Sequence, residues 1–257
     1  MQCLMLGSGS GGNAFIVKSD SIMILIDAGL SAAQIHKRMS MRGLSADDIT
    51  ACFITHEHGD HVRGASMLSL RHKVPIYMHP ATKQKTSKLW RGNETIHFLE
   101  IGDSYEFSDI TITSIPTSHD SESSMGFLFK NSRYQLGYLT DLGSVSEDTF
   151  LAMKDVDFIV MEANHDKEML LNGPYPMHLK RRVDSRVGHL SNSDSGEFLN
   201  LLVELGKLKG AILAHLSEKN NTPEKALETV LSKLKTKIPV MVASQHEPSE
   251  IIEMEKL

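Results

Sequence analysis

The chain has 257 residues, of which 40% are hydrophobic and 23% are charged, and its formal net charge is −5. This composition is typical of a globular protein and excludes a disordered or fibrous chain. A negative net charge does not by itself indicate a nucleic-acid partner, although a local basic cluster can still bind phosphate groups.

In the first half of the chain, short apolar runs bounded by turn residues alternate with helical patterns. The runs predict strands, several of them buried on both faces, at residues 3–6, 14–17, 22–26, 51–55, 75–78, 110–115 and 125–129. Apolar spacings of three and four predict helices over residues 32–42, with Ser31 as the N-cap, and over residues 80–89.

The second half repeats this alternation. Strands are predicted at residues 135–140, 157–161, 211–214 and 240–243, and helices at residues 193–205 and 223–234, the latter capped by Thr222. Buried strands with helices in both halves predict an α/β fold arranged as a four-layer αββα sandwich. Because no repeat, low-complexity tract or long linker separates the halves, we expect one domain over residues 1–257.

The cysteines and the N-terminal segment bear on the compartment. Cys3 and Cys52 each lie in an apolar run, which is typical of reduced thiols in a protein core. The first residues lack the basic region of a signal peptide, and no segment approaches the roughly 20 apolar residues that span a bilayer. We therefore expect a cytoplasmic protein without a membrane partner, and the sequence leaves the oligomeric state open.

Four side chains of the types that bind metals directly follow the apolar run at residues 51–54: His56, His58, Asp60 and His61. At the frequencies of His and Asp in this chain, chance would place such a motif with a probability of only about 0.002. Imidazole and carboxylate together suit Zn²⁺ or Mn²⁺, with iron as a further candidate. Because four adjacent ligands fit two cations about 3.5 to 4 Å apart better than one, the sequence predicts a metal-dependent hydrolase with two divalent ions.

Such a site needs further ligands from distant parts of the chain. Three residues stand at the end of an apolar run or just beyond one, and these candidate ligands are His119, Asp141 and His215. Asp27 closes the run at residues 22–26 in the same way. We expect its carboxylate to orient a ligand histidine, because metal-bound imidazoles usually donate their second N–H to an oxygen.

With these residues in place, the sequence resembles the metallo-β-lactamase superfold over nearly the whole chain. Asp27, the cluster from His56 to His61, His119, Asp141 and His215 match the motifs of that fold in order. Within the superfold the chain most resembles the YycJ/WalJ family of DNA exonucleases. Three segments carry this closer likeness, namely GSGSGGN at 7–13, GHLSN at 188–192 and HLSEKNNTP at 215–223.

The resemblance implies a 5′-to-3′ DNA exonuclease, with DNA repair as a fitting pathway, in which a hydroxide bridging two metals attacks phosphorus. It implies that His56, His58 and His119 hold one metal, that Asp60, His61 and His215 hold the other, and that Asp141 contacts both. Asp60 would also accept or orient the proton of the attacking water. By likeness to transfer-RNA processing nucleases of the superfold, Glu162 and His189 would supply a proton to the leaving oxygen.

Two sets of residues are candidates for contacts to the substrate. Cations just before His189 are expected to follow a nucleic-acid backbone, and they are Lys180, Arg181, Arg182 and Arg186. Polar residues of the Gly-rich turn are expected to hold a terminal phosphate, and they are Ser8, Ser10 and Asn13. Between Asp141 and His215 the chain has no room for the domain that β-CASP nucleases of the superfold insert there.

Other functions use the same residues. A phosphodiesterase for small cyclic or ribosyl phosphates would need the same metals and the same Glu162–His189 pair, and an RNA-processing nuclease is a further alternative. Thioester or lactone hydrolysis is disfavoured, because it would need neither such a proton donor nor the cluster of cations at residues 180–186. A non-hydrolytic di-iron redox module is disfavoured because His58 stands where such modules have a carboxylate. A binding protein without activity is disfavoured because every ligand type is in place.

Overall fold

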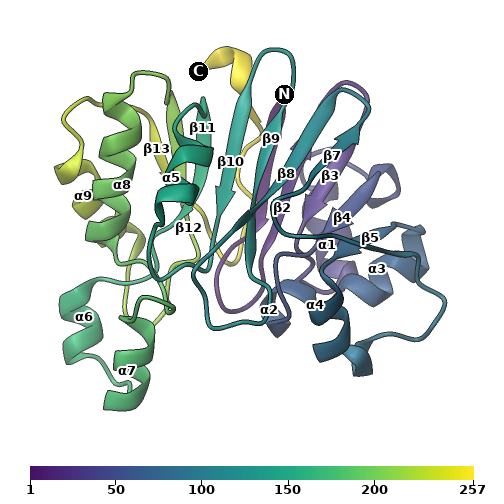
Figure 1. Cartoon of the computed structure of the whole chain (residues 1–257), viewed down its shortest axis with the longest axis horizontal. Coiled ribbons are helices and arrows are strands. Elements are labelled where there is room, and N and C mark those ends of the chain that lie inside the picture. Colours follow the sequence, from purple (N-terminus) through teal and green to yellow (C-terminus); the bar gives the residue numbers. More distant parts are fainter. The chain divides into compact units, whose positions relative to one another are not determined.

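The strands of the chain form two mixed β-sheets, and helices flank them (Figure 1). A computed structural model describes all 257 residues. They divide into two compact units that exchange segments along the sequence. The first unit comprises Met1–Ser114, Ser121–Met125 and Ser244–Lys256, and the second comprises Ile115–Asp120, Gly126–Ala243 and Leu257.

The first unit contains a seven-stranded sheet in the order β14-β1-β2-β3-β4-β5-β6. Its strands are β1 (Gln2–Gly7), β2 (Ala14–Lys18), β3 (Met23–Ile26), β4 (Ala51–Phe53), β5 (Ile76–Met78), β6 (Ile96–Phe98) and β14 (Ile252–Glu253). The strands β1, β2 and β3 are antiparallel neighbours, whereas β3, β4, β5 and β6 run parallel. The carboxyl ends of these four strands therefore lie at one edge, where the loops that follow them begin.

Helices close the core of the first unit on one face of this sheet. Leu25, Cys52 and Ile76 are buried together with Ile35 of α1 (Ala32–Ser40) and Leu68 of α3 (Ala65–His72). The unit also contains the short helices α2 (Gly59–Val62) and α4 (Pro80–Lys85) and the 3₁₀ helices η1 (Ala46–Asp48), η2 (Ser87–Leu89) and η3 (Met254–Lys256). The strand β7 (Ser104–Phe107) and most of β8 (Ile110–Pro116) form an antiparallel hairpin in this unit, and the last two residues of β8 belong to the second unit.

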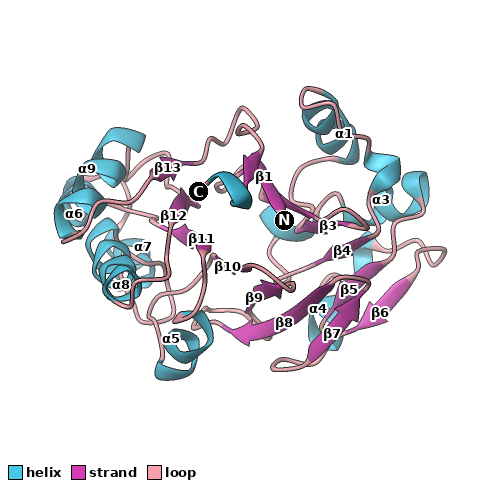
Figure 2. Ribbon diagram, turned by 90° about the horizontal axis from the view of Figure 1, so that it is seen from above, coloured by secondary structure: helices cyan, strands magenta, loops and turns pink.

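In the second unit, strands follow one another in the order β13-β12-β11-β10-β9. They are β9 (Met125–Lys130), β10 (Gln135–Leu139), β11 (Phe158–Glu162), β12 (Gly210–Ala214) and β13 (Val240–Val242), and β10 to β13 are parallel. Ile159 and Leu213 pack with Leu199 and Leu202 of α8 (Asn192–Glu204) and with Val230 of α9 (Pro223–Lys233). Figure 2 shows α8 and α9 beside these strands, together with α5 (Glu147–Met153), α6 (Lys167–Asn172) and α7 (Met177–Val183).

The predicted elements are confirmed with two corrections. The expected helix over residues 80–89 is interrupted, because Thr86 leaves the helical conformation and its hydroxyl accepts a hydrogen bond from the Trp90 indole. The expected strand over residues 51–55 ends at Phe53, because the Thr55 N–H donates to the Asp27 carboxylate at 2.9 Å and not to a neighbouring strand. The capping residues Ser31 and Thr222 lie where they were expected.

Several elements were not predicted. Short segments such as α6, α7, β6 and β7 have no long apolar periodicity, since most of their side chains are at least partly exposed. None of the helices is both long enough and apolar enough to cross a membrane.

Candidate metal centre

In each unit, the polar residues of interest follow the carboxyl ends of parallel strands. In the first unit β3 leads directly to Asp27, and β4 leads to Thr55 and His56. In the second unit β10 leads to Asp141, and β12 leads directly to His215. Parallel pairing brings such ends together within a sheet, so residues far apart in sequence share one edge of each sheet.

The backbone at three of these strand ends is left-handed. Asp27, Asp141 and His215 have φ angles of 60°, 55° and 55°. Only two other non-glycine residues share this conformation, and they are Lys73, at the end of α3, and Ser108, between β7 and β8. Such residues cost about 1 kcal/mol or more unless their surroundings hold them in place, and they are concentrated at functional sites. The backbone strain therefore points to the same three residues as the sequence pattern.

Asp27 organises the half of the site that lies in the first unit. Its carboxylate is fully buried, accepts hydrogen bonds from the backbone N–H and the hydroxyl of Thr55, and lies 2.7 Å from His61 Nδ1. Burial raises the pKa of Asp27, although the His61 ring and the Thr55 hydrogen bonds oppose that shift. These contacts fix the Nδ1 edge of the His61 ring and leave Nε2 on the opposite edge, as expected of a carboxylate that orients a ligand histidine.

The opposite edge of the His61 ring faces two residues of the same unit. His61 Nε2 lies 3.1 Å from the Asn13 side-chain nitrogen and 3.5 Å from Asp60 Oδ2. Because Nδ1 faces a carboxylate and Nε2 faces an amide N–H, the ring carries its proton on Nδ1 and its lone pair on Nε2. This is the tautomer that a metal ligand needs.

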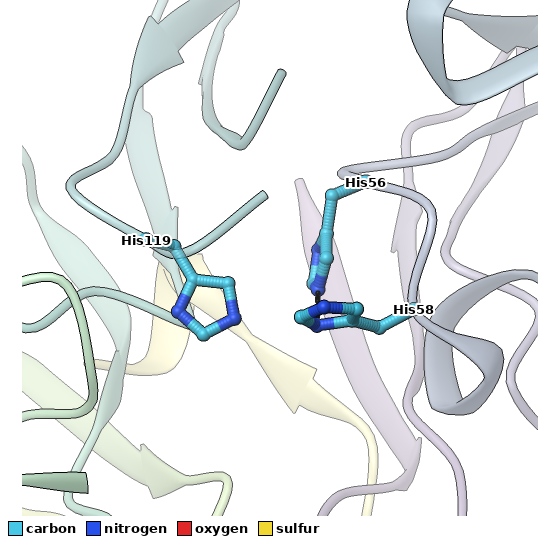
Figure 3. A group of neighbouring side chains, drawn as sticks. All are labelled: His56, His58 and His119. Atoms are coloured by element: carbon cyan, nitrogen blue, oxygen red, sulfur yellow. Dashed lines mark hydrogen bonds between the residues drawn. The ribbon is translucent and has the colours of Figure 1, made fainter. Parts of the chain in front are cut away.

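His56 and His58 direct ring nitrogens at one another. His56 Nε2 lies 3.0 Å from His58 Nδ1, as the dashed line in Figure 3 shows. Two ligands with metal–nitrogen bonds of 2.0–2.1 Å around a tetrahedral ion are separated by about 3.3 Å. The spacing of the two nitrogens therefore fits a shared cation. Thr55 contacts His56 Nδ1 at 3.0 Å, so one hydroxyl touches both the carboxylate and a histidine of the motif.

Glu162 organises the half of the site that lies in the second unit. Its side chain is fully buried, and Oε1 lies 2.9 Å from His189 Nδ1 and 2.8 Å from His215 Nδ1. Its Oε2 accepts the backbone N–H groups of Leu142 and Leu190. Burial and the charge of Asp141 raise the pKa of Glu162, but the charge of His189 and the hydrogen bonds to His189 and His215 outweigh them and lower it to about 2. Glu162 is thus an ionised hub that orients two imidazoles.

His189 is held by the Glu162 carboxylate. Burial disfavours its charged form, but the carboxylates of Glu162 and Asp141 outweigh that effect and raise the pKa of His189. Its side chain retains 20% of its exposure, whereas Glu162 has none. Of the two residues, only His189 is accessible to a substrate.

His119 follows β8 and belongs to the second unit; Figure 3 also labels it. Its Nδ1 lies 3.0 Å from the carbonyl oxygen of Gly188 and therefore donates to it. That leaves the lone pair on Nε2, which lies 3.7 Å from Asp141 Oδ1. Burial lowers the pKa of His119, which favours the neutral ring that a metal binds.

The donor set of each unit suits divalent cations. One group in the second unit has ligand atoms within 4.8 Å of one another, and it consists of Asp141, Glu162, His189 and His215. Imidazoles whose far nitrogens are held by oxygen atoms, with carboxylates beside them, match zinc, manganese and iron sites alike.

The residues expected to contact substrate differ in their surroundings. Ser8 is buried and Ser10 is exposed, while the Asn13 amide is buried and bonds to the Gly9 backbone as well as to Asp60. In the structure Asn13 therefore ties the Gly-rich turn to the metal motif, and its contact to a phosphate stays a prediction.

The basic strip lies in and after α7. Lys180 donates to the Leu171 carbonyl oxygen, and Arg182 forms an ion pair with Asp120, which adjoins His119. Arg181 and Arg186 are exposed. The ion pair to Asp120 places the strip beside the His119 loop within the second unit.

Sequence reasoning missed two residues of the site. Thr55 falls within a strand predicted from the sequence, yet its hydroxyl contacts both the Asp27 carboxylate and His56 Nδ1. Asn164 donates to the His215 carbonyl oxygen at 2.8 Å and so supports the left-handed turn at that residue. In both cases a polar residue next to a ligand or a strand end was the available signal.

Comparison with known proteins identifies relatives along almost the entire chain. Residues 23–216 match the family model described as the beta-lactamase superfamily domain. The chain is 34% identical over 235 residues to the exodeoxyribonuclease YycJ of Bacillus anthracis, covering 91% of this chain and 89% of that protein. It is 35% identical over 235 residues to the exodeoxyribonuclease WalJ of Streptococcus pneumoniae strain D39, covering 90% and 87%.

The fold has a counterpart among solved structures. The metallo-beta-lactamase fold protein YhfI from Bacillus subtilis aligns with a TM-score of 0.74 and 17% identity, covering 96% of this chain and 98% of that one. Together with the two mixed sheets and their flanking helices, this likeness confirms the expected α/β sandwich of the metallo-β-lactamase type.

Proposed function

Since this chain is a hydrolase that belongs to the β-lactamase superfamily, together with the YycJ and WalJ proteins, we propose that it is a metal-dependent 5′-to-3′ DNA exonuclease. The observation that carries the proposal is identity of 34–35% to two exodeoxyribonucleases over about nine tenths of each chain. The site supports the proposal, because the ionised Glu162 carboxylate holds His189, whose side chain is partly exposed. Proton transfer to a leaving oxygen requires such a pair.

We propose that two divalent ions, Zn²⁺ or Mn²⁺, are held by the seven residues expected from the motifs: His56, His58 and His119 for one ion, Asp60, His61 and His215 for the other, and Asp141 for both. When bound, the cations would lower the pKa of a water molecule and screen the negative charge of a phosphate. The tautomers of His61 and His119 support these assignments, because both leave the lone pair on Nε2.

Side chains of the protein would carry out the proton transfers of the reaction. Asp60 would accept or orient the proton of the attacking water. Glu162 holds His189 Nδ1, so Nε2 of the protonated ring would give its proton to the leaving alkoxide of the phosphodiester. The raised pKa of His189 favours the protonated form that this step needs.

Buried, unpaired Cys3 and Cys52 fit the reducing cytoplasm that we propose for the protein.

Digestion of end-labelled oligonucleotides tests the proposal. Duplex and single-stranded DNA and RNA, with and without a 5′-phosphate, are incubated with the protein and either Zn²⁺ or Mn²⁺. We expect stepwise shortening of DNA from the 5′ end and no shortening by an Asp60→Asn variant. Hydrolysis of a nitrophenyl phosphodiester without cleavage of any oligonucleotide would instead support a small-molecule phosphodiesterase, and faster cleavage of RNA would support RNA processing.

A further inference from the structure

A stretch of the first unit has an unusual charge distribution. From His61 to Asn93 the chain contains no aspartate or glutamate, although about four acidic residues would be expected in 33 residues at the average frequency of this chain. The same stretch holds seven cations: Arg63, Arg71, Lys73, Lys83, Lys85, Lys88 and Arg91. A surface that only contacts solvent usually carries charges of both signs. A stretch with cations and no acidic residue, in a chain with net charge −5, therefore indicates a specific role.

Four of the cations lie on α4 and the turn that follows it. The helix α4 begins directly at the carboxyl end of β5, which is the edge where the neighbouring parallel strand β4 delivers His56. Lys85 Nζ lies 2.8 Å from the Glu122 carboxylate, and the Glu122 N–H donates to Glu57, which stands between His56 and His58. The helix is therefore held beside the loop of the metal motif.

The only tryptophan of the chain lies among these cations. The Lys83 ammonium lies 4.8 Å from the centroid of the Trp90 ring, and the Trp90 indole N–H donates to Thr86. Trp90 is partly exposed, and the side chains of Lys88 and Arg91 on either side of it are exposed. Cations around an aromatic ring are the combination with which proteins bind a nucleic-acid strand.

Two nearby acidic groups, Glu94 and Glu122, offset only part of the positive charge. The Glu94 carboxylate is held by the Ser66 hydroxyl and by the backbone N–H groups of Arg91 and Gly92, and Glu122 pairs with Lys85. Lys88 and Arg91 have no carboxylate within ion-pair distance in the structure. Their charges are directed to solvent.

We propose that Lys83, Lys85, Lys88, Trp90 and Arg91, hereafter the α4 surface, bind the phosphodiester backbone of the substrate in addition to the strip in and after α7. This inference rests on the proposed nuclease function and adds a contact from the first unit, whereas the strip belongs to the second. The surface follows the backbone without reading bases, because lysine and arginine on phosphates carry no sequence information.

A triple variant tests the proposal. Lys85→Gln, Lys88→Gln and Arg91→Gln remove three exposed charges and leave Lys83 and Trp90 in place. The control, Lys154→Gln with Lys207→Gln and Lys237→Gln, removes three cations from segments that precede β11, β12 and β13 and so lie at the amino-terminal edge, away from Asp141 and His215. Circular dichroism and thermal melting of both variants confirm folding.

Binding of a fluorescein-labelled, cleavage-resistant phosphorothioate DNA strand is followed by anisotropy over a range of salt concentrations. We expect the α4 variant to bind DNA on the order of tenfold more weakly than wild type. The negative slope of log K against log salt concentration should become shallower by about 2, since each lost phosphate contact removes about 0.7 to 0.9 from its magnitude. The control variant should bind like wild type. In wild type, Trp90 fluorescence should change with the same midpoint as the anisotropy.

Equal binding by wild type and the α4 variant, or an equal loss in the control, would overturn the proposal. Hydrolysis of bis(p-nitrophenyl) phosphate by wild type measures the proposed activity separately, because this substrate is too small to span the α4 surface. If wild type hydrolyses no phosphodiester but the binding differences hold, the proposed function fails while the nucleic-acid surface stands.

Discussion

At the scale of single residues, the site depends on two buried carboxylates that do not themselves face the substrate. Asp27 holds His61, and Glu162 holds both His189 and His215. Each carboxylate is fully buried and hydrogen-bonded through both oxygens, so its cost of burial is offset only while these partners are present.

Replacement of Glu162 tests the hub in the second unit. Glu162→Gln should lower kcat about 10²- to 10⁴-fold, because the proton donor loses its orienting charge. It should also lower the pKa of His189, which Glu162 raises. Activity that needs protonated His189 is lost as the pH rises through that pKa, so the alkaline limb of the kcat profile should move to lower pH. The control is Glu168→Gln on exposed α6, and an unmoved alkaline limb in Glu162→Gln would contradict the role of the pair.

Glu94 should make the stability of the fold depend on pH, independently of any bound metal. Burial would raise the pKa of Glu94, but hydrogen bonds from Ser66, Arg91 and Gly92 lower it from its ordinary value to about 2. A depressed pKa contributes stability that is complete above the unfolded value and is lost as the pH falls from there towards 2. Glu94→Gln should therefore unfold at a lower urea concentration than wild type at pH 6, and the difference between the two should be smaller at pH 2.5. A constant difference across this range would show that the carboxylate charge is not responsible.

At the scale of elements, the loop after β3 packs against the metal motif with no room for side chains. A Cβ on Gly29 would lie 1.6 Å from the Asp60 carbonyl oxygen, and a Cβ on Gly64 would lie 2.0 Å from that of Leu30. The N–H of Asn13 also donates to the Asp60 carbonyl oxygen, so the short helix α2 is clamped by backbone on two sides. This close approach of backbones keeps Asp60 and His61 in place.

Gly29→Ala tests the clamp. The added methyl group must displace the backbone of Asp60, so we expect a loss of about 1–3 kcal/mol or more in unfolding free energy and weaker metal retention. Gly59→Ala is the matched control, since it adjoins Asp60 but its Cβ would meet nothing within 4 Å. Urea unfolding and metal analysis after dialysis measure both effects. Equal behaviour of the two variants would mean that the loop can move at little cost.

At the scale of the whole molecule, the two compact units exchange chain segments. The first unit takes residues from the N-terminal half, from Ser121–Met125 and from Ser244–Lys256. Because each unit is built from separate stretches of the chain, we expect neither unit to fold without the other. We therefore expect a single calorimetric transition with equal calorimetric and van't Hoff enthalpies, as the prediction of one domain requires. Two separate transitions would show that prediction to be wrong.

Metal removal tests the site through stability. Ions that bind the native arrangement of the proposed ligands, and not the unfolded chain, should stabilise the folded protein. A cation at about 100 times its dissociation constant contributes about 2.7 kcal/mol, which for a chain of this length raises Tm by roughly 5–10 °C. Chelation should remove that increment from wild type and leave Asp141→Asn almost unchanged. A wild-type Tm that does not respond to chelation would contradict metal binding by these residues.

The sequence alone determined which side chains end the strands, because apolar runs and the residues that close them are local features. Asp27, His56, Asp141 and His215 were identified in that way, and the fold class with them. Only the tertiary structure decided which of these residues touch. The contact of Glu162 with His215 joins residues 53 positions apart, and the contact of Asp27 with His61 joins residues 34 apart. Strand pairing makes such contacts, and one chain's hydrophobic pattern does not specify which strands become neighbours.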